Sequence, residues 1–349
     1  MTMNIQKALA RIADSNDLST QEMVDVMRQI MSAGSTDVQI GAFLMGMRVK
    51  GETIDEITGG VQVLREFASG VEVSGPNLVD IVGTGGDGAN LFNVSTAACF
   101  VVAAAGGRVA KHGNRSVSSS SGSADVLERA GVRLNITPAQ VAECVNKIGV
   151  GFMFALMHHS AMRHVTVARN ELHLRTLFNI LGPMANPAGL KQQLIGVFDR
   201  KLCRPMAEVL QRLGSEHVLV VNSNDGMDEI SIAAPTFVVE LKDGQISEYE
   251  VRPEDFGLKI EPVDELVVDG VYESLDLIKA ALSGDTEPRS RRAAHLISLN
   301  AGAALYVAGV ASSINEGVAL ANEKLASGAA MQKLQELVYM TQEFQDPSV

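Results

Sequence analysis

The sequence predicts an α/β protein in which a small, purely helical amino-terminal part precedes a larger part built on a mainly parallel sheet flanked by helices. Three observations carry this prediction. The first part of the chain, up to about residue 70, has helix caps and helical apolar spacing without a strand pattern. A strand, a glycine-rich loop, a helix and a second strand follow from residue 77. Short apolar strands then alternate with helical segments, as in a parallel sheet covered by helices.

Composition and charge exclude several classes of protein. The 349 residues suffice for about two domains, and 46% apolar with 20% charged residues is ordinary for a folded chain. Since 29 Lys and Arg stand against 41 Asp and Glu, the net charge is −12, and we expect no nucleic-acid partner. Cys99, Cys144 and Cys203 lie far apart without metal-ligand spacing, so we expect reduced core residues.

We expect a cytoplasmic protein with no membrane partner. The amino terminus has no continuous apolar stretch of the kind found in signal peptides. The longest apolar runs, near 97–105 and 301–311, are shorter than the ~20 residues that cross a bilayer.

The amino-terminal part contains two capping-box patterns, Ser19 with Glu22 and Thr53 with Glu56. Apolar residues at helical spacing follow the first cap and continue on a second segment. They are Met23, Val24, Met27, Ile30 and Met31, then Val38, Ile40, Phe43, Leu44 and Met47. We interpret this methionine-rich face as core or subunit interface rather than a cofactor site. Because short helices can bury little of it among themselves, we expect a homodimer that forms through these helices.

The sheet-forming part is predicted from short apolar runs between turn residues. Strands are expected at 78–82, 108–110, 150–155, 193–198 and 217–221. Helices are expected at about 95–105 and 137–148, where Thr137 and Pro138 resemble a cap and first turn. Residues 236–251 read as a hairpin that turns at Asp243 and Gly244. The tail from about Ser274 is expected to be helical.

The loop Gly83–Gly88 matches the pattern GxGxxG, whose glycines let a backbone approach a phosphate. A dinucleotide site also needs an acidic residue about 20 residues onward, after the second strand, and none occurs before Asp125. This disfavours NAD and leaves NADP only as a minor alternative. We expect Ser95 or Thr96 to cap the following helix, whose positive end favours an anion.

Two further segments carry side chains suited to a phosphate or a cation. Lys111 and Arg115 supply cationic donors in a stretch, 111–123, that is otherwise rich in hydroxyls and glycine; a serine-rich linker is the alternative. Asp228 and Glu229 follow a predicted strand and suit Mg²⁺, which prefers oxygen ligands and often shares them with substrate phosphates. Because ligands bind at the carboxyl ends of such strands, the three segments together predict a metal-bound polyphosphate site.

The histidines have no metal-protease spacing, and we interpret them as packed in helices. They are His158, His159, His164 and His173. No P-loop pattern GxxxxGK[ST] is present, which argues against a nucleotide hydrolase of that class.

Four motifs in order resemble the anthranilate phosphoribosyltransferase family over nearly the whole chain. They are GTGGDGAN with NVSTA (83–97), KHGNRSVSS with SGSADVLE (111–128), ARNEL with TLFNILGPMANPA (168–188) and DGMDEIS (225–231). Leu91 stands where the family often has a Ser or Thr, and Ser120 where many members have a lysine. At neither position does the resemblance imply a contact with the ligand.

The resemblance implies a set of site residues. Phosphoribosyl pyrophosphate would be held by Gly83, Gly86, Asp87, Asn93, Val94, Ser95, Thr96, Lys111, His112, Gly113, Asn114, Arg115, Ser116, Val117, Ser118, Ser119 and Ser123. Mg²⁺ would be bound by Ser95, Asp228 and Glu229, and anthranilate by Gly83, Asn114 and Arg169. Lys111 and Arg169 would carry the catalytic roles.

The resemblance also implies the fold of nucleoside phosphorylases and class III phosphoribosyltransferases, with a helical domain hinged to an α/β domain. The helical domain would cover 1–72 with a returning segment near 172–190, and the α/β domain 73–171 and 191–349. The implied reaction joins phosphoribosyl pyrophosphate to anthranilate in tryptophan biosynthesis. A pyrimidine nucleoside phosphorylase and a non-catalytic, nucleic-acid-binding relative of the fold remain as alternatives.

Overall fold

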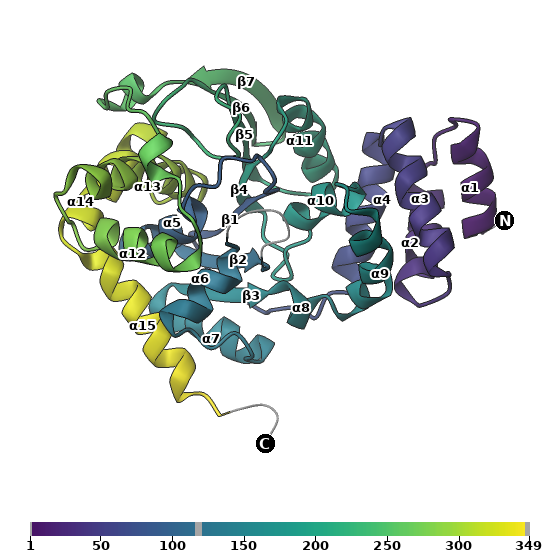
Figure 1. Ribbon diagram of the computed structural model, residues 1–349, viewed down its shortest axis with the longest axis horizontal. Coiled ribbons are helices and arrows are strands. Elements are labelled where there is room, and N and C mark those ends of the chain that lie inside the picture. Colours follow the sequence, from purple (N-terminus) through teal and green to yellow (C-terminus); the bar gives the residue numbers. More distant parts are fainter. Residues whose placement is uncertain (1, 116–120, 346–349) are drawn as a thin grey trace.

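The computed structural model describes residues 2–115 and 121–345. It consists of a helical domain and a larger α/β domain that lie side by side (Figure 1). The helical domain opens with four helices, α1 (Ile5–Ala13), α2 (Thr20–Met31), α3 (Asp37–Lys50) and α4 (Ile54–Glu66). Both predicted capping boxes are confirmed, since Ser19 and Thr53 accept from the third helical N–H and Glu22 and Glu56 bond back to the cap.

The α/β domain is built on seven strands in the order β3-β2-β1-β4-β5-β6-β7. The strands are β1 (Leu78–Gly83), β2 (Arg108–Gly113), β3 (Val150–Phe154), β4 (Gln192–Gly196), β5 (His217–Ser223), β6 (Thr236–Lys242) and β7 (Gln245–Val251). The first five run parallel, and β6 and β7 add the predicted antiparallel hairpin, which turns at Asp243 and Gly244. A mainly parallel sheet is therefore confirmed.

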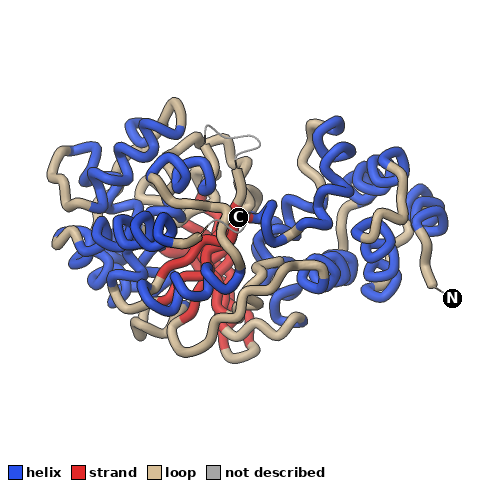
Figure 2. The backbone as a smooth tube through the Cα atoms, turned by 90° about the horizontal axis from the view of Figure 1, so that it is seen from below, coloured by secondary structure: helices blue, strands red, loops and turns tan. Residues whose placement is uncertain are grey.

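Helices cover both faces of the sheet (Figure 2). After β1 come α5 (Val94–Ala104), α6 (Ser123–Ala130), α7 (Pro138–Ile148), α8 (Ala155–His158), α9 (Arg163–Leu172), α10 (Leu177–Leu181), α11 (Cys203–Arg212), α12 (Val271–Leu282), α13 (Pro288–Val307), α14 (Ile314–Ala326) and α15 (Ala329–Glu343). Within the described residues, no helix is both long and apolar enough to span a membrane.

Alternate residues of the strands enter two different cores, as the two-residue period of a strand requires. Leu194 and Leu219 pack with α5 and α13 in the core of the α/β domain. Ile195 and Val218 belong to a second core, which continues through α11 into the helices of the helical domain. One face of the sheet and the helical domain thus share a single apolar cluster.

The methionine-rich face is core, and our argument that it forms a dimer interface is wrong. Within one chain, 2% or less of the surface is exposed at Met23, Met27, Met31, Phe43 and Met47. The apolar cluster that buries this face includes residues from far along the chain, which the local sequence pattern could not indicate. Among them are Leu177 and Leu181 of α10 and Val165 of α9. Helix α9 packs on α3, so the segment that returns to the helical domain begins before residue 172.

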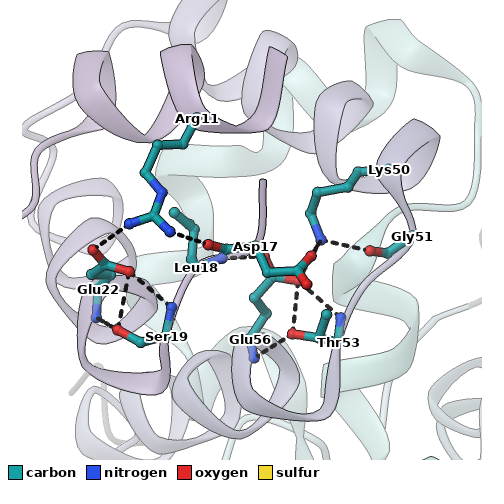
Figure 3. A network of polar contacts seen from close by, with 9 residues as sticks. All are labelled: Arg11, Asp17, Leu18, Ser19, Glu22, Lys50, Gly51, Thr53 and Glu56. Carbon is teal, nitrogen blue, oxygen red and sulfur yellow. Dashed lines mark hydrogen bonds and ion pairs between the residues drawn. The ribbon is translucent and has the colours of Figure 1, made fainter. Parts of the chain in front are cut away.

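A polar network ties the amino-terminal helices together (Figure 3). The carboxylate of Glu56 is fully buried and accepts from Lys50 Nζ at 2.9 Å, from the Leu18 N–H at 2.9 Å and from Thr53. The Lys50 ammonium also donates to Asp17 and to the Gly51 carbonyl, both at 2.7 Å. All charges in the network therefore have partners, which is the condition for burying an ion pair without a large penalty.

Candidate active site

The predicted site segments meet where the strand order reverses. Strand β1 has β2 on one side and β4 on the other, and β4 follows only after a long excursion of the chain. Open α/β sheets bind ligands at such a point, outside the carboxyl ends of the strands. The loop Gly83–Gly88 follows β1, the stretch from Gly113 follows β2, and Asp225–Glu229 follows β5.

The glycine-rich loop lies directly on the acidic loop. The Gly85 N–H donates to Asp228 Oδ2 at 2.7 Å, and the Asp228 N–H donates to Asp87 Oδ2 at 3.4 Å. A Cβ atom on Gly83 would lie 2.5 Å from Asp228 Oδ2, and one on Gly196 would overlap the Asp228 carbonyl oxygen. These two glycines are needed because backbone and carboxylate approach closely here.

Glu229 replaces the predicted side-chain cap of α5. We expected Ser95 or Thr96 to cap this helix, but α5 begins at Val94, and Asn93 at its cap makes no capping bond through its side chain. Glu229 Oε1 instead accepts from the Ser95 N–H at 3.1 Å. A carboxylate from the loop after β5 thus takes a free donor at the amino-terminal end of the helix, where the helix dipole favours negative charge.

Three carboxyl groups lie together at this edge of the sheet. Burial, and next the charge of Asp87, raise the pKa of Asp228 to about 7. Burial and the charge of Asp228 raise the pKa of Glu229 well above its ordinary value, whereas Lys111 lowers it. Since the repulsion of buried acids is the second cause of both shifts, a cation bound between them would relieve it.

The donor set is oxygen-only and small. Within the residues that the structure describes, no group of three or more His, Cys, Asp or Glu side chains is arranged to hold a metal ion. Mg²⁺, however, is often bound by only one or two carboxylates together with water and substrate phosphates. Asp228, Glu229 and the Ser95 hydroxyl therefore fit a metal that is shared with a phosphorylated ligand, and they do not fit a closed structural site.

Lys111 lies beneath the loop. The residue is 4% exposed, and its ammonium donates to the Ile81 carbonyl at 2.5 Å and to Ser95 Oγ at 3.2 Å. Its charge lowers the pKa of Glu229 and opposes the effect of burial on Asp80, whose pKa is raised to about 6. In this arrangement the lysine balances buried carboxylates and fixes the Ser95 hydroxyl.

Asp80 and Asn186 are site-supporting residues that the sequence reasoning missed. Asp80 is fully buried, accepts from Asn186 Nδ2 at 2.7 Å and accepts from the His112 N–H at 3.2 Å. These bonds join β1, β2 and the segment that follows α10. Asn186 lies in the TLFNILGPMANPA motif and Asp80 lies three positions before GTGGDGAN, but no spacing rule connects positions 106 residues apart.

The stretch after β2 is described only in part. Ser116, Val117, Ser118, Ser119 and Ser120 lie outside the described residues. Arg115 forms ion pairs with Asp125 at 3.0 Å and Glu128 at 2.7 Å, so two carboxylates already engage its guanidinium.

Asn93 and Asn114 arrange the neighbouring backbone. Asn93 Oδ1 accepts from Ser121 Oγ and Ser274 Oγ, both at 2.8 Å. The Asn114 carbonyl accepts from Ser123 Oγ at 3.4 Å. Leu91 forms a backbone bridge with Val267 and packs on the apolar core.

Arg169 is a partly buried cation on α9. Its guanidinium carbon lies 5.4 Å from the centre of the Phe178 ring, and burial lowers its pKa. Among the described residues it has no carboxylate partner. A shielded arginine without a counter-ion is suited to bind a carboxylate from a ligand.

Three buried histidines lie between the domains. The rings of His112 and His159 are 5.0 Å apart, and the Nε2 atom of each lacks a hydrogen-bond partner within the described part of the chain. His158 Nδ1 bonds to the Ser69 carbonyl at 2.9 Å. Burial, and next the charge of His158, lower the pKa of His159 to about 4.

We predict that His159 makes the fold sensitive to acid. Its ordinary pKa is about 6.5, so below pH 6.5 the unfolded chain binds a proton that the native state refuses until about pH 4. The stabilisation is complete above pH 6.5 and is lost as the pH falls, by about 2 kcal/mol at pH 5. Urea unfolding at pH 8 and pH 5 should show a smaller pH effect in His159→Gln than in the wild type. An identical loss in both proteins would contradict this prediction.

Comparisons with known proteins place this fold in the glycosyl transferase family. Residues 6–68 match the helical bundle domain of the glycosyl transferase family, and residues 75–331 match its a/b domain. The anthranilate phosphoribosyltransferases of Ectopseudomonas mendocina (strain ymp) and Marinobacter nauticus are each 61% identical over 342 residues, covering 98% of this chain and 98% and 100% of theirs.

The solved structures agree. The anthranilate phosphoribosyltransferase from Thermus thermophilus superposes with a TM-score of 0.90 at 41% identity, covering 96% of this chain and 99% of that one. The Saccharomyces cerevisiae enzyme in complex with PRPP and Mg shares the fold, with a TM-score of 0.89 at 24% identity over 97% and 98% of the two chains. The chain belongs to the anthranilate phosphoribosyltransferase family.

Proposed function

We propose that the protein transfers the 5-phosphoribosyl group from phosphoribosyl pyrophosphate to the amino group of anthranilate. The products are N-(5-phosphoribosyl)anthranilate and pyrophosphate, and the step belongs to tryptophan biosynthesis. The observation that carries the proposal is the contact of the Gly83–Gly88 loop with Asp228 at the strand-order reversal, in a chain of this family. The loop supplies backbone N–H groups, and the acidic loop supplies oxygen ligands.

Mg²⁺ would be held by Ser95, Asp228 and Glu229. The metal would neutralise charge on the diphosphate oxygens. The structure supports this assignment because the two carboxyl groups are neighbours, are only partly exposed, and have raised pKa values.

The chain's own groups would act mainly by placement and electrostatics. Departure of pyrophosphate from C1 of the ribose leaves negative charge on the departing oxygens, which loop N–H groups can stabilise. The aromatic amine of anthranilate is already neutral at pH 7, so it needs orientation more than a strong base. Arg169 would bind the anthranilate carboxylate and direct the amine toward C1, and Lys111 would keep Ser95 in position.

The test of the proposal is a direct assay. The protein is mixed with anthranilate, phosphoribosyl pyrophosphate and Mg²⁺, and the loss of anthranilate fluorescence is followed. No loss at any Mg²⁺ concentration would overturn the proposal. Phosphorolysis of a pyrimidine nucleoside with inorganic phosphate would instead favour the phosphorylase alternative.

Arg169→Ala should separate the two substrates. Loss of a charge-assisted hydrogen bond costs ~1.5 to 3 kcal/mol, so the apparent KM for anthranilate should rise roughly 10- to 150-fold. Calorimetric binding of phosphoribosyl pyrophosphate should stay close to wild type. Arg163→Ala is the matched control, because Arg163 lies on the same helix and is exposed. Weaker phosphoribosyl pyrophosphate binding with unchanged anthranilate kinetics would move Arg169 to the phosphate site.

Homodimerisation through the helical domain is part of the proposal. With the methionine-rich face buried, the available apolar surface is a stripe on α3. Val38, Met45 and Val49 lie on one helix face, and 82%, 39% and 75% of their surfaces are exposed.

A further inference from the structure

We propose that Arg175 is a positioning residue for the phosphate-binding loop. It links Gly86 to the turn between α9 and α10, so that binding of phosphoribosyl pyrophosphate depends on the packing of the helical domain. The inference rests on the proposed function, because it assumes that the Gly83–Gly88 loop binds this substrate.

The guanidinium of Arg175 lies on the loop. Its Nη2 donates to the Gly86 carbonyl, and its Cζ lies 4.1 Å from the centre of the Phe198 ring. A Cβ atom on Gly86 would lie 2.9 Å from Arg175 Nε, and Gly86 has a φ of +76°. The loop backbone is therefore shaped to receive the arginine, and Phe198 supports the planar group from its face.

The backbone of Arg175 is held from the helical domain. Its carbonyl accepts a hydrogen bond from Arg48 of α3, a residue 127 positions earlier in the chain. His173 ends α9 in the left-handed conformation, with a φ of +48°, and so turns the chain. A single residue thus connects α3 with the loop after β1. In Figure 1, α9 and α10 lie between the amino-terminal helices and the sheet.

The other contacts of the loop come from the α/β domain. The Thr84 N–H donates to the Gly196 carbonyl at 2.9 Å, and Thr84 Oγ1 accepts from the Phe198 N–H at 3.1 Å. Gly85 is held by Asp228. Because these contacts do not involve Arg175, its loss should leave the loop attached to the sheet and remove only the link to the helical domain.

Arg175 lies close in the chain to the anthranilate side of the proposed site. Arg169, the proposed anthranilate ligand, lies on α9 six positions before it. The anthranilate side of the site and the phosphate loop are thus connected through one short segment. We expect the link to increase the affinity of the loop for its substrate by reducing the disorder that binding must remove.

The first experiment measures Arg175→Ala. The KM and calorimetric Kd for phosphoribosyl pyrophosphate should rise about three- to tenfold, the range of one exposed charged hydrogen bond with a cation–π contact. Both kcat and the KM for anthranilate at saturating phosphoribosyl pyrophosphate should change less than about twofold, a split that general destabilisation would not produce. Arg175→Lys should restore part of the affinity, since lysine can donate to the carbonyl.

The second experiment tests the link itself. Arg48→Ala should raise the same KM by a smaller factor, and the double variant Arg48→Ala/Arg175→Ala should be no worse than Arg175→Ala alone. Arg129→Ala is the matched control, because Arg129 stacks on Tyr272 at 4.0 Å without touching the loop. Additive effects, or an unchanged Kd in Arg175→Ala, would overturn the inference. A wild-type protein that does not bind phosphoribosyl pyrophosphate would overturn the proposed function instead.

Discussion

Glu229→Gln is expected to lower kcat/KM by roughly 10²- to 10³-fold, the cost of removing one electrostatic contribution to a transition state. The amide keeps the shape of the carboxylate but carries no charge. It therefore binds Mg²⁺ only weakly and accepts a weaker hydrogen bond from the Ser95 N–H. The concentration of Mg²⁺ needed for half-maximal activity should rise in the same variant. Asp228→Asn should act in the same direction.

Steady-state rates measured across a Mg²⁺ titration test this expectation. Glu240→Gln is a matched control, because Glu240 lies on β6, a strand outside the site. Glu240 is 8% exposed, and its carboxylate is held by His217, Tyr249 and Tyr306. The control variant should keep wild-type metal dependence. If Glu229→Gln and Asp228→Asn both retain wild-type rates and metal dependence, these carboxylates are not the metal ligands.

Glu56→Ala is expected to lower the free energy of unfolding by about 3 to 5 kcal/mol. The substitution removes the carboxylate from four donors, among them Lys50 and the Leu18 N–H (Figure 3). The Lys50 side chain is 4% exposed, so its charge would stay buried with Asp17 as its remaining ion-pair partner. The fully buried N–H of Leu18 would lose its acceptor.

Urea unfolding measures this loss, and Glu22→Ala provides the comparison. Glu22 occupies the same capping-box position in α2, but 27% of its side chain is exposed. Its loss should cost only about 1 kcal/mol, the usual value of a cap. If the two substitutions cost the same, burial of the ion pair adds nothing to the capping box.

Local signals in the sequence were enough to predict the helices and strands and to predict that the site segments lie close together. Ser19 with Glu22 and Asp243 with Gly244 act within a few residues, and the structure has both features. The carboxyl ends of parallel strands share one edge, so the contact of Gly85 with Asp228 followed from strand polarity. This part of the site needed no knowledge of side-chain packing.

Long-range choices were not predictable from the same signals. The N–H groups at the amino-terminal end of α5 have two possible acceptors, a local hydroxyl and a remote carboxylate. Glu229 accepts from the Ser95 N–H because the acidic loop lies against this end of the helix. The sequence left Met27 as either core or subunit interface, because part of the cluster that buries it, such as Leu177 and Leu181, lies far along the chain. Arg175 lies between the ARNEL and TLFNILGPMANPA stretches, but its role was not predicted, because its contact is with a backbone carbonyl of a remote loop.

The apolar cluster shared by the helical domain and the sheet has a consequence for synthesis of the chain. Residues from α1 to α4 are buried against α9 to α11 and against alternate residues of β4 to β6. Such non-local contacts slow folding, because the intervening chain must be ordered before they form. The amino-terminal helices therefore leave the ribosome with an incomplete core, and their apolar faces stay open until about residue 240 has been translated. During that interval the nascent chain is open to aggregation, so its yield in the cell should depend on chaperones more than that of a protein whose amino-terminal domain closes by itself.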